Sequence, residues 1–367
     1  MSDVSAAEEH FAARLGAYKR AIDDDIASYA LHIRDVTRGQ YGSKVADIDA
    51  DVFLDILTRG GKRIRGALVM AGYEMCGGTN QEMIVQVARA IEMLHAYILI
   101  IDDIQDRSSL RRGKPTAHKM LTAYHRKHRL QGDEAHAGIS LALDAALAGA
   151  HAAEMILANV NADAELRLKV LSIVNRTMAI TAHGQTLDIM NELVKTPEAA
   201  DIERVLEWKT ALYTIINPLH VGMVLAGADC RATDAITPYG QHVGKAFQIT
   251  DDILGIYGNE QSLGKTPGDD IREGKGTVLT MYALRHASQP DAAFLRSCLG
   301  KQDLTHAEFT KCRAIIETSG ALAHAKKMAL DHARAALTTL DEATGLWSED
   351  GTVFLRSLVA ALQGRAA

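Results

Sequence analysis

Three carboxylates and an adjacent pair of arginines are concentrated in the stretch IDDIQDRSSLRRGKPTAH, residues 101–118 of this 367-residue chain. Asp102, Asp103 and Asp106 come directly after an apolar run, and Arg111 and Arg112 follow them. Carboxylates this close repel one another, and an apolar neighbourhood also removes water from them, so their ionised forms are stable only near cations. The stretch therefore predicts a site that binds something positively charged.

A second acidic pair, Asp251 and Asp252, lies in GKAFQITDDILGIYG, and the next segment, SLGKTPGDDIREGKGT, adds Lys265 and Lys275. A lone pair of aspartates is more often a solvated helix end than a functional site. Here, however, both acidic pairs are followed by Lys or Arg residues. We therefore interpret both pairs as parts of one site.

The residue types in these segments favour Mg²⁺ together with a phosphate ligand. Aspartate oxygens without clustered His or Cys suit Mg²⁺, which uses one or two carboxylates plus waters and phosphate oxygens. Arg111 and Arg112 can bind phosphate through their planar guanidinium groups, while Lys265 and Lys275 add positive charge from the opposite wall. We therefore expect several Mg²⁺ ions bound with a diphosphate.

A separate anion site is predicted by the segment RGGKRIRGALV, which contains Lys62 and Arg65. These two residues are three positions apart, so they share one face of a helix that begins after the glycines. A surface helix often carries such a pair, which makes this signal weak by itself.

The elements that must position these side chains are predicted to be helices. In QEMIVQVARAIEMLHAYILIIDD the apolar residues recur at three- and four-residue steps from Ile84 to Ile98, the pattern of a helix with one buried stripe. On this helix Asp102 and Asp106 are one turn apart on the same face, while Asp103 points elsewhere. Their spacing allows them to share a cation.

Composition favours an all-α fold, because 47% of the residues are hydrophobic but only 5% are aromatic. The six prolines are spread thinly, and no Gly/Ser-rich linker divides the chain. We therefore expect residues 1–367 to form a single large domain.

Several classes of protein are excluded by charge and pattern. A net charge of −6 argues against a general nucleic-acid or anionic-membrane surface. No run approaches the roughly 18 apolar residues of a membrane span. The four cysteines lack CxxC spacing, which suits reduced thiols, and the acidic N-terminal segment does not resemble a signal peptide. We expect a cytoplasmic protein.

The chain resembles the trans-isoprenyl diphosphate synthases, the polyprenyl synthetase family, in motifs that occur in the family's order. These motifs, within residues 60–280, are GGKRIR, EMLHAYILIIDDIQDRSSLRRGKPTAH, GQTLDI, KTALYT and FQITDDILGIYG with GKTPGDDIREGKGT. The resemblance implies a helical bundle around a central cavity, of isoprenoid synthase type. It also implies a homodimer that condenses isopentenyl diphosphate with an allylic diphosphate.

The resemblance implies a role for each motif residue. Residues that match Mg²⁺ ligands are Asp102, Asp106 and Asp251, with Asp103 and Asp252 in support. Residues that match contacts of the allylic diphosphate are Arg111, Lys209, Gln248, Lys265 and Lys275. Residues that match the isopentenyl diphosphate site are Lys62, Arg65, His95 and Arg112. Positions that match the surroundings of the allylic cation are Thr210 and Gln185, with Tyr213 and Asp188 as neighbours.

Two residues on the same helix, Tyr97 and Ile98, are candidates for determining the length of the product. They lie five and four residues before Asp102. Tyr97 lies about 7–8 Å along the helix from the acidic site, where a bulky ring can limit a growing chain. Without the resemblance, ordinary core packing is the simpler reading of this ring. In the family an aromatic residue at this position is associated with short products. The resemblance thus implies geranylgeranyl diphosphate, with farnesyl diphosphate next.

One departure from the family pattern is Gly255, which occupies the last acidic position of the second motif, usually DDxxD. We expect activity to survive this change. Two alternatives stay open: a class I terpene cyclase, which needs no isopentenyl diphosphate site, and a non-catalytic subunit of a heteromeric synthase, which could lose metal ligands. The retained basic residues and both aspartate pairs favour the transferase.

Overall fold

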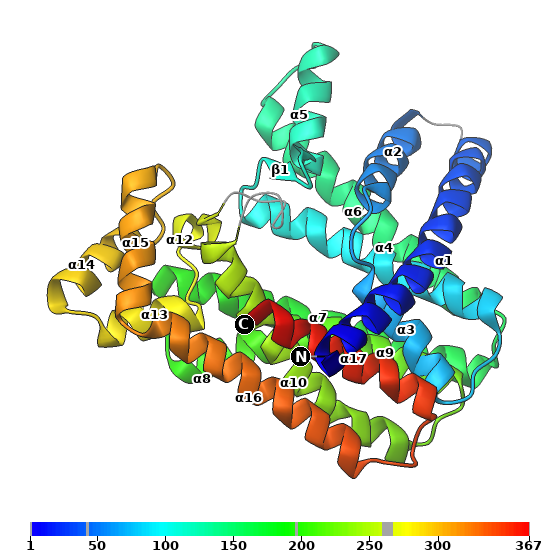
Figure 1. The fold of residues 1–367 in the computed structure, drawn as a ribbon. Helices are drawn as coiled ribbons and strands as arrows, with labels where there is room; N and C mark the ends of the chain where they lie inside the picture. The colour runs from blue at the N-terminus through cyan, green and yellow to red at the C-terminus, as the bar shows by residue number, and fades with distance from the viewer. Residues whose placement is uncertain (1, 42–43, 195–196, 259–266, 367) are drawn as a thin grey trace.

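The computed structural model is almost entirely helical, which confirms the expected all-α fold (Figure 1). It describes residues 2–41, 44–194, 197–258 and 267–366. The helices of the first half are α1 (Ser2–Tyr41), α2 (Lys44–Thr58), α3 (Ile64–Met75), α4 (Gln81–Gln105), α5 (Ala117–Lys127), α6 (Glu134–Asn159) and α7 (Ala164–Val194). A two-stranded hairpin, β1 (Leu110–Arg111) and β2 (Lys114–Pro115), joins α4 to α5.

The second half is also helical. Its elements are α8 (Ala199–Val205), the π-helix η1 (Leu206–Ile216), α9 (Asn217–Leu225), α10 (Cys230–Tyr257), α12 (Asp269–Glu273), α13 (Val278–His286), α14 (Gln289–Cys298), α15 (His306–Thr318), α16 (Ala321–Glu342) and α17 (Glu349–Ala366). The short helices α12 to α15 form a lobe at one side of the molecule (Figure 1).

The helix that carries the first acidic motif is a central core element. The Asn80 side chain accepts a hydrogen bond from the Met83 N–H at 3.1 Å, which caps the start of α4. The apolar stripe of α4 is buried in the larger hydrophobic cluster from Ile84 to Leu94, as the periodicity predicts, whereas the last residue of the predicted stripe, Ile98, is only partly buried and lines the cavity described below. The end of α4 is thereby held in place by its buried length.

Close packing of α3 against α9 positions two further segments of the site. A Cβ atom at Gly72 would lie 2.5 Å from the Leu219 carbonyl oxygen, and one at Gly222 would meet the Val69 backbone. Only glycine allows the two helix backbones to approach this closely. The approach sets η1, which leads directly into α9, beside the start of α3.

A second hydrophobic cluster lies under the lobe of short helices and includes residues of α8, η1 and α10. Helix α10 contributes to both clusters, with Val243 and Ala246 in the larger and Ile249 and Ile253 in the smaller. The second acidic pair therefore lies in the part of α10 that packs into the smaller cluster.

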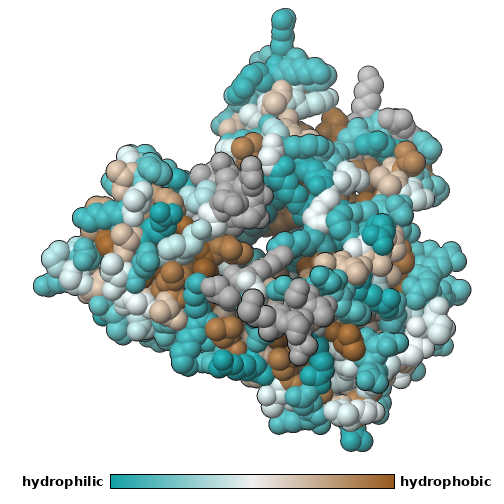
Figure 2. Space-filling view, viewed as in Figure 1, coloured by the Kyte–Doolittle hydropathy of each residue, from teal (hydrophilic) through white to brown (hydrophobic). Residues whose placement is uncertain are grey.

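Two described helices, α4 and α6, are long and apolar enough to cross a membrane by length and composition alone. The expectation that no segment approaches a membrane span is therefore too strict. The most apolar window of α4 is 61% buried within the molecule, whereas that of α6 is 39% buried. For α4 the apolar sequence reflects a place in the core. The face of the molecule that Figure 2 shows is mostly hydrophilic, with small hydrophobic patches.

Candidate active site

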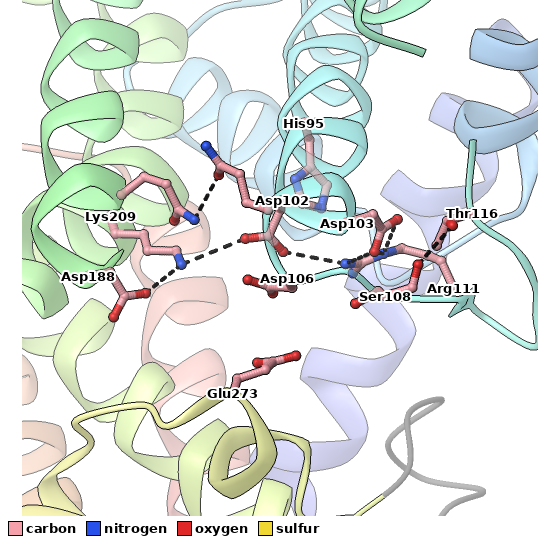
Figure 3. A network of polar contacts seen from close by, with 12 residues as sticks. His95, Asp102, Asp103, Asp106, Ser108, Arg111, Thr116, Asp188, Lys209 and Glu273 are labelled. Carbon is pink, nitrogen blue, oxygen red and sulfur yellow. Dashed lines mark hydrogen bonds and ion pairs between the residues drawn. The ribbon is translucent and has the colours of Figure 1, made fainter. Parts of the chain in front are cut away.

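The first acidic motif forms the last turn of α4, where Asp102 and Asp106 lie one turn apart as predicted. The Asp106 N–H donates to the Asp102 carbonyl oxygen at 2.8 Å and closes this turn. Asp103 points away from them and is only 1% exposed. Its carboxylate accepts hydrogen bonds from the Arg111 guanidinium (Figure 3). Arg111 Nε lies 2.8 Å from Oδ1 and 2.9 Å from Oδ2 of Asp103, and Arg111 Nη2 lies 2.6 Å from Oδ1. The hairpin after α4 thus returns Arg111 to the buried aspartate.

Protein cations already approach the exposed side of this motif. Asp102 lies 3.4 Å from Arg111 Nη2 and 3.7 Å from Lys209 Nζ, and Lys209 also binds Asp188 at 2.8 Å (Figure 3). Burial alone would lower the pKa of Lys209, but Asp188 and Asp102 outweigh it and hold this pKa above its ordinary value. Lys209 is therefore a permanent cation beside the aspartates.

The second acidic pair divides into one buried and one cavity-facing residue. Asp252 is 8% exposed, and its carboxylate accepts from the Gln248 amide at 2.8 Å. Burial raises the pKa of Asp252 well above its ordinary value, and the nearby Asp270 and Asp251 raise it further. Asp251 lines the cavity described below. The buried Asp252 therefore supports the second motif from behind, while Asp251 faces the cavity.

Lys275 connects the first acidic motif to Glu273 of α12. Its Nζ lies 3.5 Å from Asp106 Oδ2 and 2.7 Å from Glu273 Oε2. Burial would lower the pKa of Lys275, yet Asp106, Asp270 and Glu273 together raise it well above its ordinary value. The predicted second lysine, Lys265, lies outside the described residues.

The Gly255 position is filled by a neighbouring carboxylate. A Cβ atom at residue 255 would lie 2.8 Å from Oδ2 of Asp270, which belongs to α12. Asp270 also lies close enough to Asp252 to raise its pKa. The Asp270 carboxylate thus occupies the space where the family pattern usually has an acidic side chain at position 255.

Two substitutions at Gly255 should differ in their effect on stability. Gly255→Ala adds a helix-favouring residue worth up to about 1 kcal/mol, provided that the Asp270 carboxylate moves aside. Gly255→Asp adds the same Cβ but also a further negative charge beside Asp252 and Asp270, so we expect a lower free energy of unfolding than for Gly255→Ala. Urea unfolding of both variants measures the difference. Equal stability of the two would show that charge repulsion at this position is unimportant.

The expected isopentenyl diphosphate site brings Arg65, His95 and Tyr213 together from three helices. Arg65 Nη1 lies 3.2 Å from His95 Nε2, and Arg65 Nη2 donates to the Thr214 hydroxyl at 2.7 Å. Because a guanidinium cannot accept, His95 Nε2 is the acceptor and its Nδ1–H donates to the Tyr213 hydroxyl at 3.0 Å. Burial and the nearby arginines lower the pKa of His95 well below its ordinary value, so the ring is neutral.

The predicted geometry of Lys62 is wrong. Lys62 precedes α3, which begins at Ile64, so it does not share a helical face with Arg65. The backbone is left-handed at Arg63, with φ 52°, which prevents the helix from starting at the glycines. Arg112 donates a hydrogen bond to the Gly60 carbonyl oxygen, so the glycine segment before α3 lies beside Arg112. Burial, Arg63 and Arg111 lower the pKa of Arg112, which indicates excess positive charge suited to an anion.

A cavity of about 660 Å³ begins at the acidic motifs and continues between α4, α6, α7, η1 and α10. Residues predicted for the site that line it are Arg65, His95, Asp102, Gln185, Lys209, Thr210, Tyr213, Gln248 and Asp251. Tyr97 and Ile98 line it further along α4. The cavity therefore joins the charged groups to the two residues predicted to affect product length.

The π-helix η1 places several of its side chains in the wall of this cavity. Four of its residues line the wall: Lys209, Thr210, Tyr213 and Thr214. π-Helical geometry is rare and is often found at functional sites. The Thr210 hydroxyl donates to Gln248 at 2.8 Å, and Gln248 in turn donates to Asp252. This chain of hydrogen bonds couples η1 to the second acidic motif.

Sequence reasoning missed two acidic residues that also face the site, Glu192 and Glu273. Burial, Asp188, Asp106 and Glu273 raise the pKa of Glu192 to about 7, although Lys275 opposes this. Glu192 is four residues after Asp188, so helical spacing could have revealed it. Glu273 faces Asp106 only because α12 folds back toward α4, which no local pattern indicates (Figure 3).

The aspartate oxygens have the chemistry that Mg²⁺ requires. Among the residues that the structure describes, no three His, Cys, Asp or Glu side chains are gathered tightly enough to hold a metal by themselves. Mg²⁺, however, needs only one or two carboxylates when waters and phosphate oxygens complete its coordination. Asp102 of the first acidic motif and Asp251 of the second face the same cavity. The donor set therefore fits Mg²⁺ that is bound together with a diphosphate.

Comparisons with known proteins agree on one family. The model of the polyprenyl synthetase family matches residues 49–316. A short chain isoprenyl diphosphate synthase of Methanothermobacter thermautotrophicus is 33% identical, over 81% of this chain and 86% of its own length. A geranylgeranyl diphosphate synthase of Saccharolobus solfataricus is 32% identical, over 78% of this chain and 81% of its own length.

A solved structure shows the same arrangement of helices. It is a geranylgeranyl pyrophosphate synthase from Corynebacterium glutamicum, complexed with isoprenyl diphosphate and magnesium. The two chains are 30% identical and superimpose with a TM-score of 0.89, over 95% of this chain and 98% of the other.

Proposed function

Because the chain belongs to the polyprenyl synthetase family and is a prenyltransferase, we propose that it condenses isopentenyl diphosphate with an allylic diphosphate, giving mainly geranylgeranyl diphosphate. Farnesyl diphosphate is the next candidate product. The observation that carries this proposal is one cavity with charged groups at one end and an apolar wall beyond them. Such a cavity suits a ligand with a charged head and a hydrocarbon tail.

The residues of the charged end divide into three groups. Asp102, Asp106 and Asp251 would hold Mg²⁺, which when bound neutralises the diphosphate and so favours its departure. Cations that would bind the allylic diphosphate are Arg111, Lys209 and Lys275, together with Lys265. Groups that would bind isopentenyl diphosphate are Lys62, Arg65 and Arg112, beside His95.

The proposed reaction breaks the allylic carbon–oxygen bond and forms a carbon–carbon bond. The bonding electron pair leaves with the diphosphate, whose growing charge Arg111 and Lys209 stabilise. The double bond of isopentenyl diphosphate attacks the allylic cation, and the departing pyrophosphate takes the proton that is lost. Thr210, Gln185 and Gln248 place oxygen atoms beside the cation. Two substrates held in one cavity replace a bimolecular encounter by a positioned step.

Incubation with Mg²⁺, isopentenyl diphosphate and each allylic primer tests this function. Chain elongation, read by chromatography of the dephosphorylated alcohols, is the expected result. A cyclic hydrocarbon from the allylic substrate alone would instead indicate a class I terpene cyclase. No product with any primer would indicate a non-catalytic subunit.

Tyr97 is proposed to limit product length, since its ring lines the cavity beyond the acidic motif. Tyr97→Ala should deepen the cavity and shift the products toward longer chains, at some cost in stability from the lost packing. The same chromatography measures the shift. Tyr124→Ala, a change outside the cavity lining on α5, is the matched control. An unchanged distribution would mean that another residue limits the chain.

We also propose a homodimer in which α6 and α7 meet their counterparts. Several large apolar side chains on these two helices are exposed in the single chain: Leu143, Leu147, Met155, Leu168, Met190 and Leu193. An exposed strip of this kind is typical of a surface that another subunit covers. Light scattering should give twice the mass of one chain, and only monomer at micromolar concentration would contradict the proposal.

We further infer that residues 1–367 act as one domain and that the protein is cytoplasmic. All four cysteines are free thiols, the state that the reducing cytosol maintains. The shared membership of α10 in both hydrophobic clusters supports a single folding unit.

A further inference from the structure

The segment between α4 and α6 is strongly basic in a chain that is acidic overall. Residues 107–131, which we call the basic arm, comprise the β1–β2 hairpin, α5 and the turns beside them. The basic arm contains eight Lys and Arg residues and no Asp or Glu, whereas the whole chain has a net charge of −6. Arg111 and Arg112 belong to the site described above, and the other cations of the arm have no role in the proposed reaction.

These other cations are all exposed to solvent: Arg107, Lys114, Lys119, Arg126, Lys127 and Arg129. Lys119 is seven and eight positions before Arg126 and Lys127, so these three share one face of α5. Arg126 forms an exposed ion pair with Glu134. Within the part of the chain that the structure describes, neither Lys119 nor Lys127 has an ion pair. The exposed face of α5 therefore carries positive charge that the protein leaves uncompensated.

The opposite face of α5 is buried and fixes the position of these cations. Leu121 and His125 are buried there, and His125 Nε2–H donates to the Gln131 carbonyl oxygen at 3.1 Å, which holds the turn after the helix. A Cβ atom at Gly138 of α6 would lie 2.6 Å from the His118 carbonyl oxygen, so the two helices pack closely. The cations thus project from a packed helix.

Two large apolar side chains are exposed beside the cations. Leu110 of β1 is 56% exposed, and Leu130, after α5, is 47% exposed. The hairpin is anchored, since the Arg59 guanidinium donates to the carbonyl oxygens of Arg111 and Pro115 at 3.2 and 2.8 Å. Cations with leucines suit the surface of a bilayer, where Lys and Arg contact anionic headgroups and apolar side chains enter the hydrocarbon boundary. A nucleic-acid backbone would bind the cations but offer the leucines no apolar contact.

The basic arm lies at one end of the molecule, where α5 and the start of α6 project (Figure 1). An anionic surface repels the net charge of the chain, but electrostatic interactions in solution decay over a Debye length of about 10 Å at 0.1 M salt. The cations nearest the surface therefore outweigh more distant carboxylates. The arm contains none of the residues of the apolar strip on α6 and α7, so the proposed homodimer does not depend on it.

We propose that the basic arm docks on the surface of a bilayer that contains anionic phospholipid. Arg111 of the same hairpin lies 3.4 Å from Asp102, so docking places the charged end of the cavity near the bilayer. The hydrocarbon tail of the product can then enter the bilayer with little exposure to water. This consequence for the product rests on the proposed function, whereas the docking does not.

Sedimentation of the purified full chain with phospholipid vesicles tests the docking. More protein should sediment with vesicles of phosphatidylglycerol and phosphatidylcholine than with phosphatidylcholine alone, and added salt should release it. Lys119→Glu/Lys127→Glu should weaken the binding by about tenfold or more, because each basic residue near an anionic surface contributes to it. The matched control, Lys311→Glu/Lys327→Glu, changes the net charge equally at exposed lysines of α15 and α16.

The docking is supported if the arm variant binds more weakly than the control and Leu130→Ser also loses affinity. Equal sedimentation with both kinds of vesicle, or an equal loss in the control, overturns it. Tighter binding to a duplex RNA oligonucleotide than to the anionic vesicles, unaffected by Leu130→Ser, also overturns it and indicates a nucleic-acid partner.

Chain elongation in vesicle-free solution tests the proposed function separately. It should be unchanged in every variant, since none of the substituted residues lines the cavity. Loss of docking with normal elongation therefore concerns the basic arm alone, and absence of elongation in the wild-type protein contradicts only the function. Circular dichroism and light scattering identify any misfolded variant, for which Lys119→Gln/Lys127→Gln repeats the comparison.

Discussion

Asp102→Asn should lower turnover by about two to three orders of magnitude, since one of the proposed Mg²⁺ ligands loses its charge. The amide keeps the shape of the side chain, so α4 and the cavity wall should be unchanged. Asp102 faces the cavity and lies between Arg111 and Lys209, where the leaving diphosphate is proposed to bind. Steady-state turnover at saturating substrate and Mg²⁺ measures the effect.

A matched control for this variant is Asp331→Asn on α16. Asp331 is an exposed aspartate that pairs with Lys327 on the same helix, far from the cavity lining. Its replacement should leave turnover unchanged. Turnover near the wild-type value in Asp102→Asn would remove Asp102 from the proposed metal site.

Arg111→Met should produce the largest loss of stability. The carboxylate of Asp103 is 1% exposed and depends on the Arg111 guanidinium for three hydrogen bonds. Removing one partner of a buried pair leaves an uncompensated charge, which costs about 3–5 kcal/mol. The free energy of unfolding in urea should fall by that amount. Activity should fall as well, because Arg111 also faces Asp102.

The double variant Asp103→Asn/Arg111→Met separates the two effects. It removes the buried charge together with its partner, so most of the lost stability should return. Activity should remain low, because the cation is still absent from the diphosphate site. If Arg111→Met alone were as stable as the wild type, other contacts of Asp103 would be sufficient to stabilise its buried carboxylate.

Local patterns in the sequence predicted the parts of the site that one helix determines. The stripe from Ile84 to Leu94 fixed the buried face of α4, and the spacing of Asp102 and Asp106 then placed both in one turn. These predictions hold because helical geometry relates neighbouring residues directly. The same reasoning failed at Lys62, where a left-handed residue interrupts the expected helix.

Contacts between distant segments could not be predicted in this way. Lys275 reaches Asp106 across 169 positions of sequence, and Asp270 fills the space beside Gly255 because α12 folds back on α10. The family resemblance named Lys275 as a diphosphate contact, yet it did not indicate this link between Asp106 and Glu273. Tertiary packing, which no local period encodes, determines both contacts.

The cations that approach the acidic motifs also affect the order of folding and metal loading. Arg111, Lys209 and Lys275 each lie within 4.0 Å of an aspartate of the first motif, so the protein itself compensates part of that charge. A zinc finger, by contrast, stays unfolded until its metal arrives. We therefore expect this chain to fold without Mg²⁺ and to bind the proposed ions together with its substrate. A chelator should accordingly stop turnover while the helices stay intact.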